Sequence, residues 1–479
     1  MTTRANASTK LTHIQLTEPF LTFDPLDAAQ KHLNPLAGLA AFGPYSAAAW
    51  KIDHHQVRVA ILAPYDAIDP IRSLLNELRD SAEPRERRDY LPPYPGFKPA
   101  FRAALVPAEA AARQPLPDDL DRKMAASAEP HIILARALTE GLGRLAAVRS
   151  LFDVAVFYLP HRWERSFVVG EFDLHDHVKA AGARLGLPTQ IVTDQAMSYR
   201  CRASVRWRLA TALYAKAGGV PYKLASEGML DPGAAYVGLA YGIRDAGRPA
   251  NSFVVCCSQL FDGQGGGLEF VAHDVSGEVD PRNPYLSRPE MRSILSRSLN
   301  IYADRHAGRR PSQLIVHKAY PFTDEESRGA AEAWGRGDEL TCVSLTKPAW
   351  RGVQVTTAKD PKTGRPRYGY AVDRGTLTQL DDYSALLWVN GNAAEATLTG
   401  RPYLQGGKGT PRPLLLTRHV GRGPLAQPAA QILALSKMDW NTDALYRSMP
   451  ATIIYAQLLA KIVKHETLAP VPYDYRLFM

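Results

Sequence analysis

The chain has 479 residues, of which 46% are hydrophobic, and a formal net charge of +9. These values indicate two to four globular domains with a full core and favour a polyanionic partner such as nucleic acid. No apolar run approaches the roughly 20 residues that span a bilayer, and the polar N-terminus lacks the apolar core of a signal peptide, so we expect a cytoplasmic protein with no membrane partner.

The first half of the chain alternates between apolar strands and helices. After a lead-in of residues 1–53, the runs Val57–Ala63 and Asp153–Leu159 predict buried strands, and Thr189–Val192 predicts a third. Helices are predicted from Asp69 onward, over residues 131–149, around His175 and Lys179, and over residues 203–217. Residues 80–100, which are charged and then rich in proline, predict a surface loop. This order predicts a Rossmann-like α/β domain over residues 54–224, with ligands at the carboxyl ends of its strands.

The segment from His175 to Lys223 carries the clearest chemical pattern of this domain. His175 and Lys179 are four residues apart and therefore share a helix face, and Gln190 lies on the next predicted strand. Lys216 is followed by two glycines, which let the backbone approach a ligand closely. Cations and backbone amides gathered at one place suit a phosphate. The alternative is a solvated helix face, because runs of charge usually lie on the surface.

From residue 225 the order of elements changes. A meander of three strands is followed by helix, strand, helix and strand, which is the order of a ribonuclease H-like fold over residues 225–479. The two helices begin at capping boxes, Ser287 with Glu290 and Thr323 with Glu326. A last amphipathic helix begins at Pro450, and the aromatic tail after it is predicted to dock on the protein.

The positions where a ribonuclease H-like nuclease would need acids carry none. Such an enzyme holds two divalent ions with several carboxylates, yet the first strand of the meander has Ala240, and the strand ending at His317 continues into Lys318 and Ala319. We therefore expect no enzymatic activity in this chain. A metal-dependent nuclease remains the alternative, and the acids in these neighbourhoods are Asp262, Glu269 and Asp324.

Together these motifs resemble the MID and PIWI half of prokaryotic Argonaute proteins. Four residues match, in order and spacing, the family motif that holds the 5′-phosphate of the guide: His175, Lys179, Gln190 and Lys216. Residues 216–222 match the family's K-x-G-G-x-P-[WY] run. The segments 236–240 and 316–319 resemble two PIWI strands that usually carry a catalytic Asp, and residues 439–442 resemble the family's C-terminal region.

The resemblance implies a short, slicer-inactive Argonaute, because the chain has no room for N-terminal and PAZ domains and lacks two catalytic acids. It implies binding of a 5′-phosphorylated RNA guide and a complementary single-stranded DNA target. It also implies a heterodimer with an APAZ-containing effector that is either sirtuin-like or TIR. This effector would hydrolyse NAD and abort infection. The resemblance is compatible with higher oligomers after activation. A stand-alone nucleic-acid-binding regulator is the other alternative.

The resemblance also implies roles for individual residues. A Mg²⁺ ion would bridge the guide 5′-phosphate, Gln190 and the terminal carboxylate of Met479. His175 would stack on or bond to the first nucleotide. Five basic residues would contact the nucleic-acid backbone: Arg200, Arg202, Arg206, Arg208 and Lys223.

Overall fold

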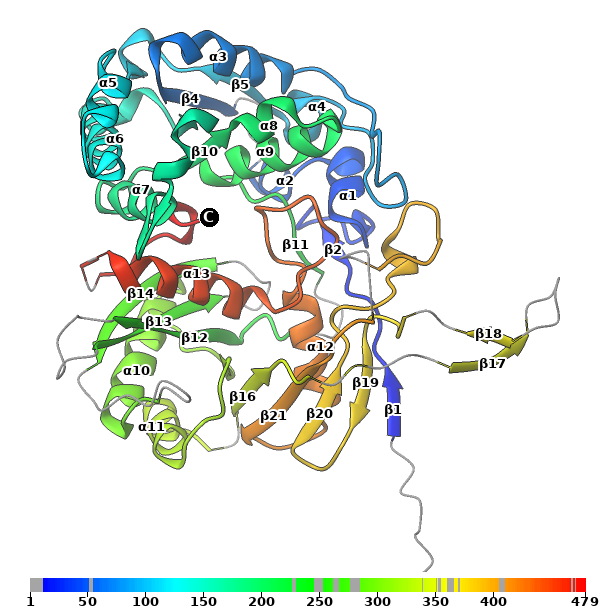
Figure 1. Cartoon of the computed structure of the whole chain (residues 1–479). Helices are drawn as coiled ribbons and strands as arrows, with labels where there is room; N and C mark the ends of the chain where they lie inside the picture. The colour runs from blue at the N-terminus through cyan, green and yellow to red at the C-terminus, as the bar shows by residue number, and fades with distance from the viewer. Residues whose placement is uncertain are drawn as a thin grey trace, which may run out of the picture.

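The computed structural model shows two α/β domains, each built around its own sheet (Figure 1). It describes residues 12–50, 55–225, 230–244, 253–261, 267–275, 285–337, 339–349, 351, 355–359, 366–368, 371–404, 410–466, 468–469 and 471–479. A Rossmann-like domain is followed by a ribonuclease H-like domain, so the predicted fold class is confirmed. None of the helices in these ranges has the length and apolar character needed to cross a membrane.

The first domain has a parallel sheet in the order β10–β7–β4–β5, with β6 paired to the end of β4. Its strands are β4 (His55–Ala63), β5 (Ala103–Pro107), β6 (Arg113–Pro115), β7 (Val154–Leu159) and β10 (Thr189–Thr193). Its helices are α1 (Pro35–Phe42), α2 (Tyr45–Trp50), α3 (Ile68–Glu77), α4 (Phe97–Phe101), α5 (Leu120–Ala125), α6 (Pro130–Ala146), α7 (Leu174–Arg184), α8 (Asp194–Ser198) and α9 (Arg202–Lys216). Every residue of β7 is buried, because helices α3 and α9 cover one face of the sheet and α6 covers the other.

The second domain has a nine-stranded sheet in the order β1–β19–β20–β21–β16–β15–β12–β13–β14. Its strands are β1 (Thr12–Gln15), β12 (Ala235–Arg244), β13 (Phe253–Phe261), β14 (Gly267–Val275), β15 (Leu314–Lys318), β16 (Leu340–Thr346), β19 (Thr376–Gln379), β20 (Ser384–Leu387) and β21 (Leu414–Val420). Its helices are α10 (Arg288–Arg305), α11 (Asp324–Trp334), α12 (Ala426–Leu435) and α13 (Ala451–His465). The meander β12–β13–β14 is antiparallel and both capping boxes form, as predicted.

Short sheets complete the chain. They are β2 (Leu21–Thr22) with β3 (Lys31–His32) and β11 (Lys223–Leu224), β8 (Val168–Val169) with β9 (Phe172–Asp173), and β17 (Val355–Lys359) with β18 (Pro366–Tyr368). The chain's end turns back between the domains, beside α7 (Figure 1), and its last aromatic residues are buried, so the prediction of a docked tail is confirmed.

Helix α13 lies directly on the main chain of β12. A Cβ atom added at Gly238 would stand 2.0 Å from the Thr452 carbonyl oxygen, and one at Gly242 would stand 2.5 Å from the Ala460 oxygen. Ala240, midway between these glycines, is only 4% exposed. The small side chains of this strand therefore permit a close approach that larger ones would prevent.

We expect Gly238→Ala to destabilise the protein by about 3 kcal/mol, because α13 must shift to admit the methyl group. Gly143→Ala is the matched control, since nothing lies within 4 Å of its added Cβ on the exposed face of α6. Gly143→Ala should stabilise the protein by roughly 0.5–1 kcal/mol through helix propensity. Urea unfolding measures both changes, and equal midpoints for the two variants would contradict the close packing of α13.

The prediction of a surface loop over residues 80–100 is wrong for its second half. Tyr90 and Tyr94 are buried, and the Tyr94 hydroxyl donates to the Leu78 carbonyl at 2.7 Å. The indole of Trp207 in α9 donates to the Pro92 carbonyl at 3.0 Å. The aromatic side chains between the prolines are apolar enough to join the core. The charged first half of the segment led to the prediction of a surface loop for all of it.

The described part of the lead-in, residues 12–50, contributes α1 and α2 to the first domain and β1 to the second. Strand β1 forms an edge of the second domain's sheet by pairing with β19, more than 350 residues later in the chain. Glu18 is buried between Arg374 and Lys437, with each contact at 2.8 Å. Such distant pairing leaves no local pattern in the sequence.

Candidate functional site

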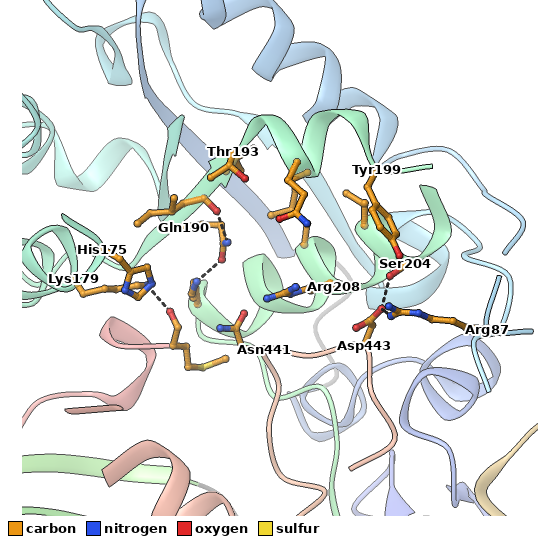
Figure 2. A pocket seen from close by; sticks show the side chains of 18 residues that line it. Arg87, His175, Lys179, Gln190, Thr193, Tyr199, Ser204, Arg208, Asn441 and Asp443 are labelled. Atoms are coloured by element: carbon orange, nitrogen blue, oxygen red, sulfur yellow. Dashed lines mark hydrogen bonds and ion pairs between the residues drawn. The ribbon is translucent and has the colours of Figure 1, made fainter. Parts of the chain in front are cut away.

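A pocket of about 440 Å³ lies where α7, β10 and α9 of the first domain meet the chain's last residue (Figure 2). The four residues of the predicted phosphate motif all line it: His175, Lys179, Gln190 and Lys216. The interpretation of this segment as a purely solvated helix face is therefore wrong, because both lysines are buried.

Lys179 reaches the pocket from the middle of α7 and is only 2% exposed. Its ammonium donates to the Thr189 carbonyl at 2.7 Å and to the main-chain oxygen of Met479. Burial lowers the pKa of Lys179 to about 7, partly offset by a hydrogen bond with Lys216.

Lys216 ends α9 and is 3% exposed. Its ammonium donates to the side-chain oxygen of Gln190, whose amide nitrogen donates to the Ile191 carbonyl at 2.9 Å. Burial, followed by repulsion from Lys179, holds the pKa of Lys216 well below its usual value. No Asp or Glu side chain in the described ranges pairs with either lysine. Beside the carboxyl end of Met479, which Lys179 contacts, these two buried and mutually repelling amines would be stabilised in their charged form by an anionic ligand.

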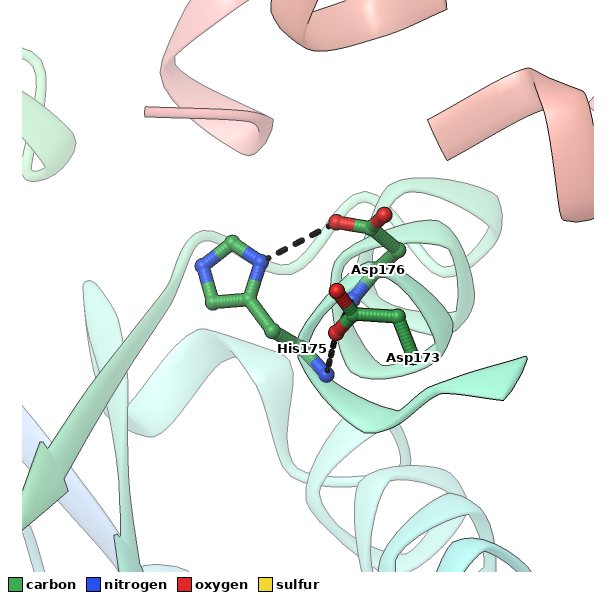
Figure 3. Close-up of side chains that lie close together, drawn as sticks. All are labelled: Asp173, His175 and Asp176. Atoms are coloured by element: carbon green, nitrogen blue, oxygen red, sulfur yellow. Dashed lines mark hydrogen bonds and ion pairs between the residues drawn. The ribbon is translucent and has the colours of Figure 1, made fainter. Parts of the chain in front are cut away.

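Three potential metal ligands gather beside His175 at the start of α7. One ligand atom from each of Asp173, His175 and Asp176 lies within 4.8 Å of the others (Figure 3). The Lys461 ammonium of α13 lies 2.8 Å from Asp173 and 3.2 Å from Asp176. Because this ammonium already pairs with both carboxylates, we assign no metal here.

The Mg²⁺ ion implied by the family resemblance has suitable donors in the pocket. The side-chain oxygen of Gln190 and the main-chain oxygen of Met479 both face it, each accepting a hydrogen bond from a lysine. Hard oxygen donors of this kind, completed by phosphate oxygens and water, suit Mg²⁺. The donor set therefore fits an ion that arrives together with a phosphate.

Of the five predicted backbone contacts, only Arg208 lines the pocket, where its side chain is exposed. Arg202 and Arg206 instead lie 2.8 Å and 3.5 Å from Glu77 of α3. Lys223 lies over the ring of Tyr45 with its ammonium 5.3 Å from the centroid, and Arg200 is exposed outside the lining.

The far end of the pocket contains residues that the sequence did not indicate. Arg87 and Asp443 form an ion pair of 3.3 Å, and the Ser204 hydroxyl also donates to Asp443 (Figure 2). Arg87 adopts a left-handed backbone conformation with φ of 61°, which is uncommon for a residue other than glycine. These groups come from the loop before α4, from α9 and from the segment before α13, so no local motif could reveal them.

The two alanines at the expected catalytic positions lie near α13. Ala240 lies beneath this helix, and Ala319 follows the end of β15 and is partly buried. Asp324 is exposed at the start of α11, which packs on the opposite face of the sheet. Asp262 lies outside the described residues, as does the side chain of Glu269. Within the described side chains, no group of three metal-ligating residues forms around Ala240.

The lowered pKa of Lys179 predicts a pH effect on the protein without ligand or metal. Between about pH 7 and about pH 10, the unfolded chain holds a proton on this lysine that the folded protein has lost. The free energy of unfolding should therefore rise with pH in this window, by up to about 1.4 kcal/mol per pH unit. Urea unfolding in a chelator at several pH values measures the slope, and Lys179→Met should reduce it. An unchanged slope in that variant would contradict the assignment.

Comparisons with known proteins show the fold. No protein-family model and no curated protein matches the chain. Clostridium butyricum Argonaute, solved with a guide DNA and a 19-mer target DNA, is similar with a TM-score of 0.63 and 15% identity, over 98% of this chain and 55% of that one. Aa-Ago with externally bound siRNA is similar with a TM-score of 0.57 and 16% identity, over 97% and 56%. A. aeolicus Argonaute is similar with a TM-score of 0.50 and 15% identity, over 88% of this chain and 50% of that one. The chain thus spans about half the length of the Argonaute structures it resembles.

Proposed function

We propose that this chain is the guide-binding, non-cleaving subunit of a short Argonaute system. The observation that carries the proposal is the pair of buried lysines, Lys179 and Lys216, which share a pocket with Gln190 and pair with no acidic side chain in the part of the chain that the structure describes. A terminal phosphate would bring negative charge to both lysines and would accept charge-assisted hydrogen bonds from them. Gln190 and Met479 would hold a Mg²⁺ ion against that phosphate.

The Argonaute-like fold supports a nucleic-acid ligand for this pocket. The C. butyricum neighbour was solved with both a guide and a target strand, and the net charge of +9 suits such a partner. We propose an RNA guide and a DNA target, with sequence specificity supplied by base pairing. Because Ala240 and Ala319 replace the expected acids, target recognition would be passed to a cytoplasmic APAZ-containing effector that depletes NAD during infection.

Binding of guides that differ only at the 5′ end tests the proposal. The protein should bind a 5′-phosphorylated RNA about 100-fold more tightly than the same RNA with a 5′-hydroxyl, a difference of about 2.7 kcal/mol. Fluorescence anisotropy measures both dissociation constants. Equal affinities would exclude a guide-phosphate site. Copurification of a partner chain from the native host separates the effector complex from a stand-alone regulator.

Arg208→Ala should weaken guide binding about tenfold, because it removes an exposed cation that lines the pocket. It should also reduce the dependence of log Kd on log salt concentration by about 0.7, the share of one phosphate contact with a single strand. Arg202→Ala is the control, since Arg202 pairs with Glu77 outside the pocket. An equal loss in both variants would indicate a diffuse charge effect rather than a contact of Arg208.

A further inference from the structure

One lysine of the second domain pairs with two carboxylates next to the predicted phosphate site of the first domain. Lys461 of α13 donates to Asp173 at 2.8 Å and lies 3.2 Å from the Oδ2 atom of Asp176 (Figure 3 shows the two carboxylates beside His175). Asp173 is also the N-cap of α7 and accepts from the main-chain N–H of His175 at 2.9 Å. Lys461 therefore holds the first turn of α7 in place.

Asp176 lies between Lys461 and the imidazole of His175. It is only 1% exposed, and its Oδ1 atom lies 3.2 Å from the Nδ1 atom of His175. A buried carboxylate without a cation would be strongly destabilising. Lys461 thus provides the cationic partner of the buried Asp176.

The contact with Asp176 determines which nitrogen of His175 faces a ligand. A carboxylate can only accept a hydrogen bond, so the Nδ1 atom of His175 carries the hydrogen. The Nε2 atom is then left for the pocket, whose wall also includes Lys179, one helical turn further along α7. An imidazole ring held in one orientation loses less conformational entropy when a ligand binds to it.

We propose that Asp176 and Lys461 are positioning residues for His175, so that α13 of the second domain tunes recognition of the guide 5′ end by the first domain. This inference rests on the proposed function. Neither residue lines the pocket, so we expect them to act on the guide through His175, the pocket residue that Asp176 contacts.

The experiment compares two lysines on one face of α13. Lys461→Met should reduce the preference for 5′-phosphorylated over 5′-hydroxyl RNA about tenfold, the size expected for loss of one hydrogen bond to a charged group. Lys464→Met is the matched control, because Lys464 pairs with the exposed Glu171, 3.3 Å away, and has no link to His175. Lys461→Arg should retain the preference. Asp176→Asn, which has the same shape without the charge, should behave like Lys461→Met even if the lysine variant folds poorly.

A double-mutant cycle separates positioning from general stability. In a His175→Ala background, Lys461→Met should have no further effect on the 5′-phosphate preference, because the residue that it positions is gone. A similar reduction in that background, or in Lys464→Met, would overturn the proposal. So would an unchanged preference in both Lys461→Met and Asp176→Asn while the wild-type protein discriminates. A wild-type protein that does not discriminate would overturn the proposed function as well.

Discussion

The double variant Lys179→Met, Lys216→Met should lose its preference for 5′-phosphorylated guides entirely. Each lysine would contribute a charge-assisted hydrogen bond of about 1.5–3 kcal/mol, so the affinity for the phosphorylated guide should fall at least 100-fold, or about 2.7 kcal/mol. Methionine retains the apolar stem that each lysine buries. Anisotropy titrations with phosphorylated and hydroxyl guides measure the loss, and the hydroxyl guide should bind almost as before.

The same variant should still fold without a guide. Both lysines are buried, and Lys179 is one of the causes that lower the pKa of Lys216, so removing the charges removes a repulsion. Lys223→Met is the control: Lys223 lies over the Tyr45 ring outside the pocket lining, and its loss should affect both guide types equally. A double variant that keeps the preference for the phosphate would exclude these lysines as its binding site.

The second large effect concerns the expected catalytic position. Ala240→Asp should destabilise the protein by about 3 kcal/mol, because it places a carboxylate without a partner under α13. Ala319→Asp should cost less, since Ala319 is only partly buried. Urea unfolding compares the two variants, and equal losses would contradict the difference in burial.

Restoring both acids should also fail to restore cleavage. The described side chains provide no further group of metal ligands near Ala240, whereas a two-metal site needs several carboxylates. A labelled DNA target incubated with the guide-loaded double variant and Mg²⁺ or Mn²⁺ should remain intact. Cleavage by the wild-type protein would overturn the proposal of a non-cleaving subunit.

Much of the local structure was predictable because short-range rules determine it. The β-branched run of β4 and the capping boxes of α10 and α11 appear where the sequence places them. The side chains of the phosphate motif were predictable too, since α7, β10 and α9 follow one another closely in the chain. The burial of Tyr94 was not predictable. Charge and proline content indicate a loop, but they do not indicate whether the side chains of that loop are buried.

The sequence by itself determined the two fold classes, the order of their elements and the identity of four pocket residues, because these follow from local periodicity and spacing. Only the tertiary structure decided which charged side chains line the pocket. It paired Arg202 with Glu77 and left Arg208 at the pocket, and it brought Arg87 and Asp443 together from opposite ends of the chain. It also placed Lys461 beside Asp176 and buried Ala240 beneath α13. Burial and ion pairing depend on contacts between residues far apart in sequence, and no local pattern encodes them.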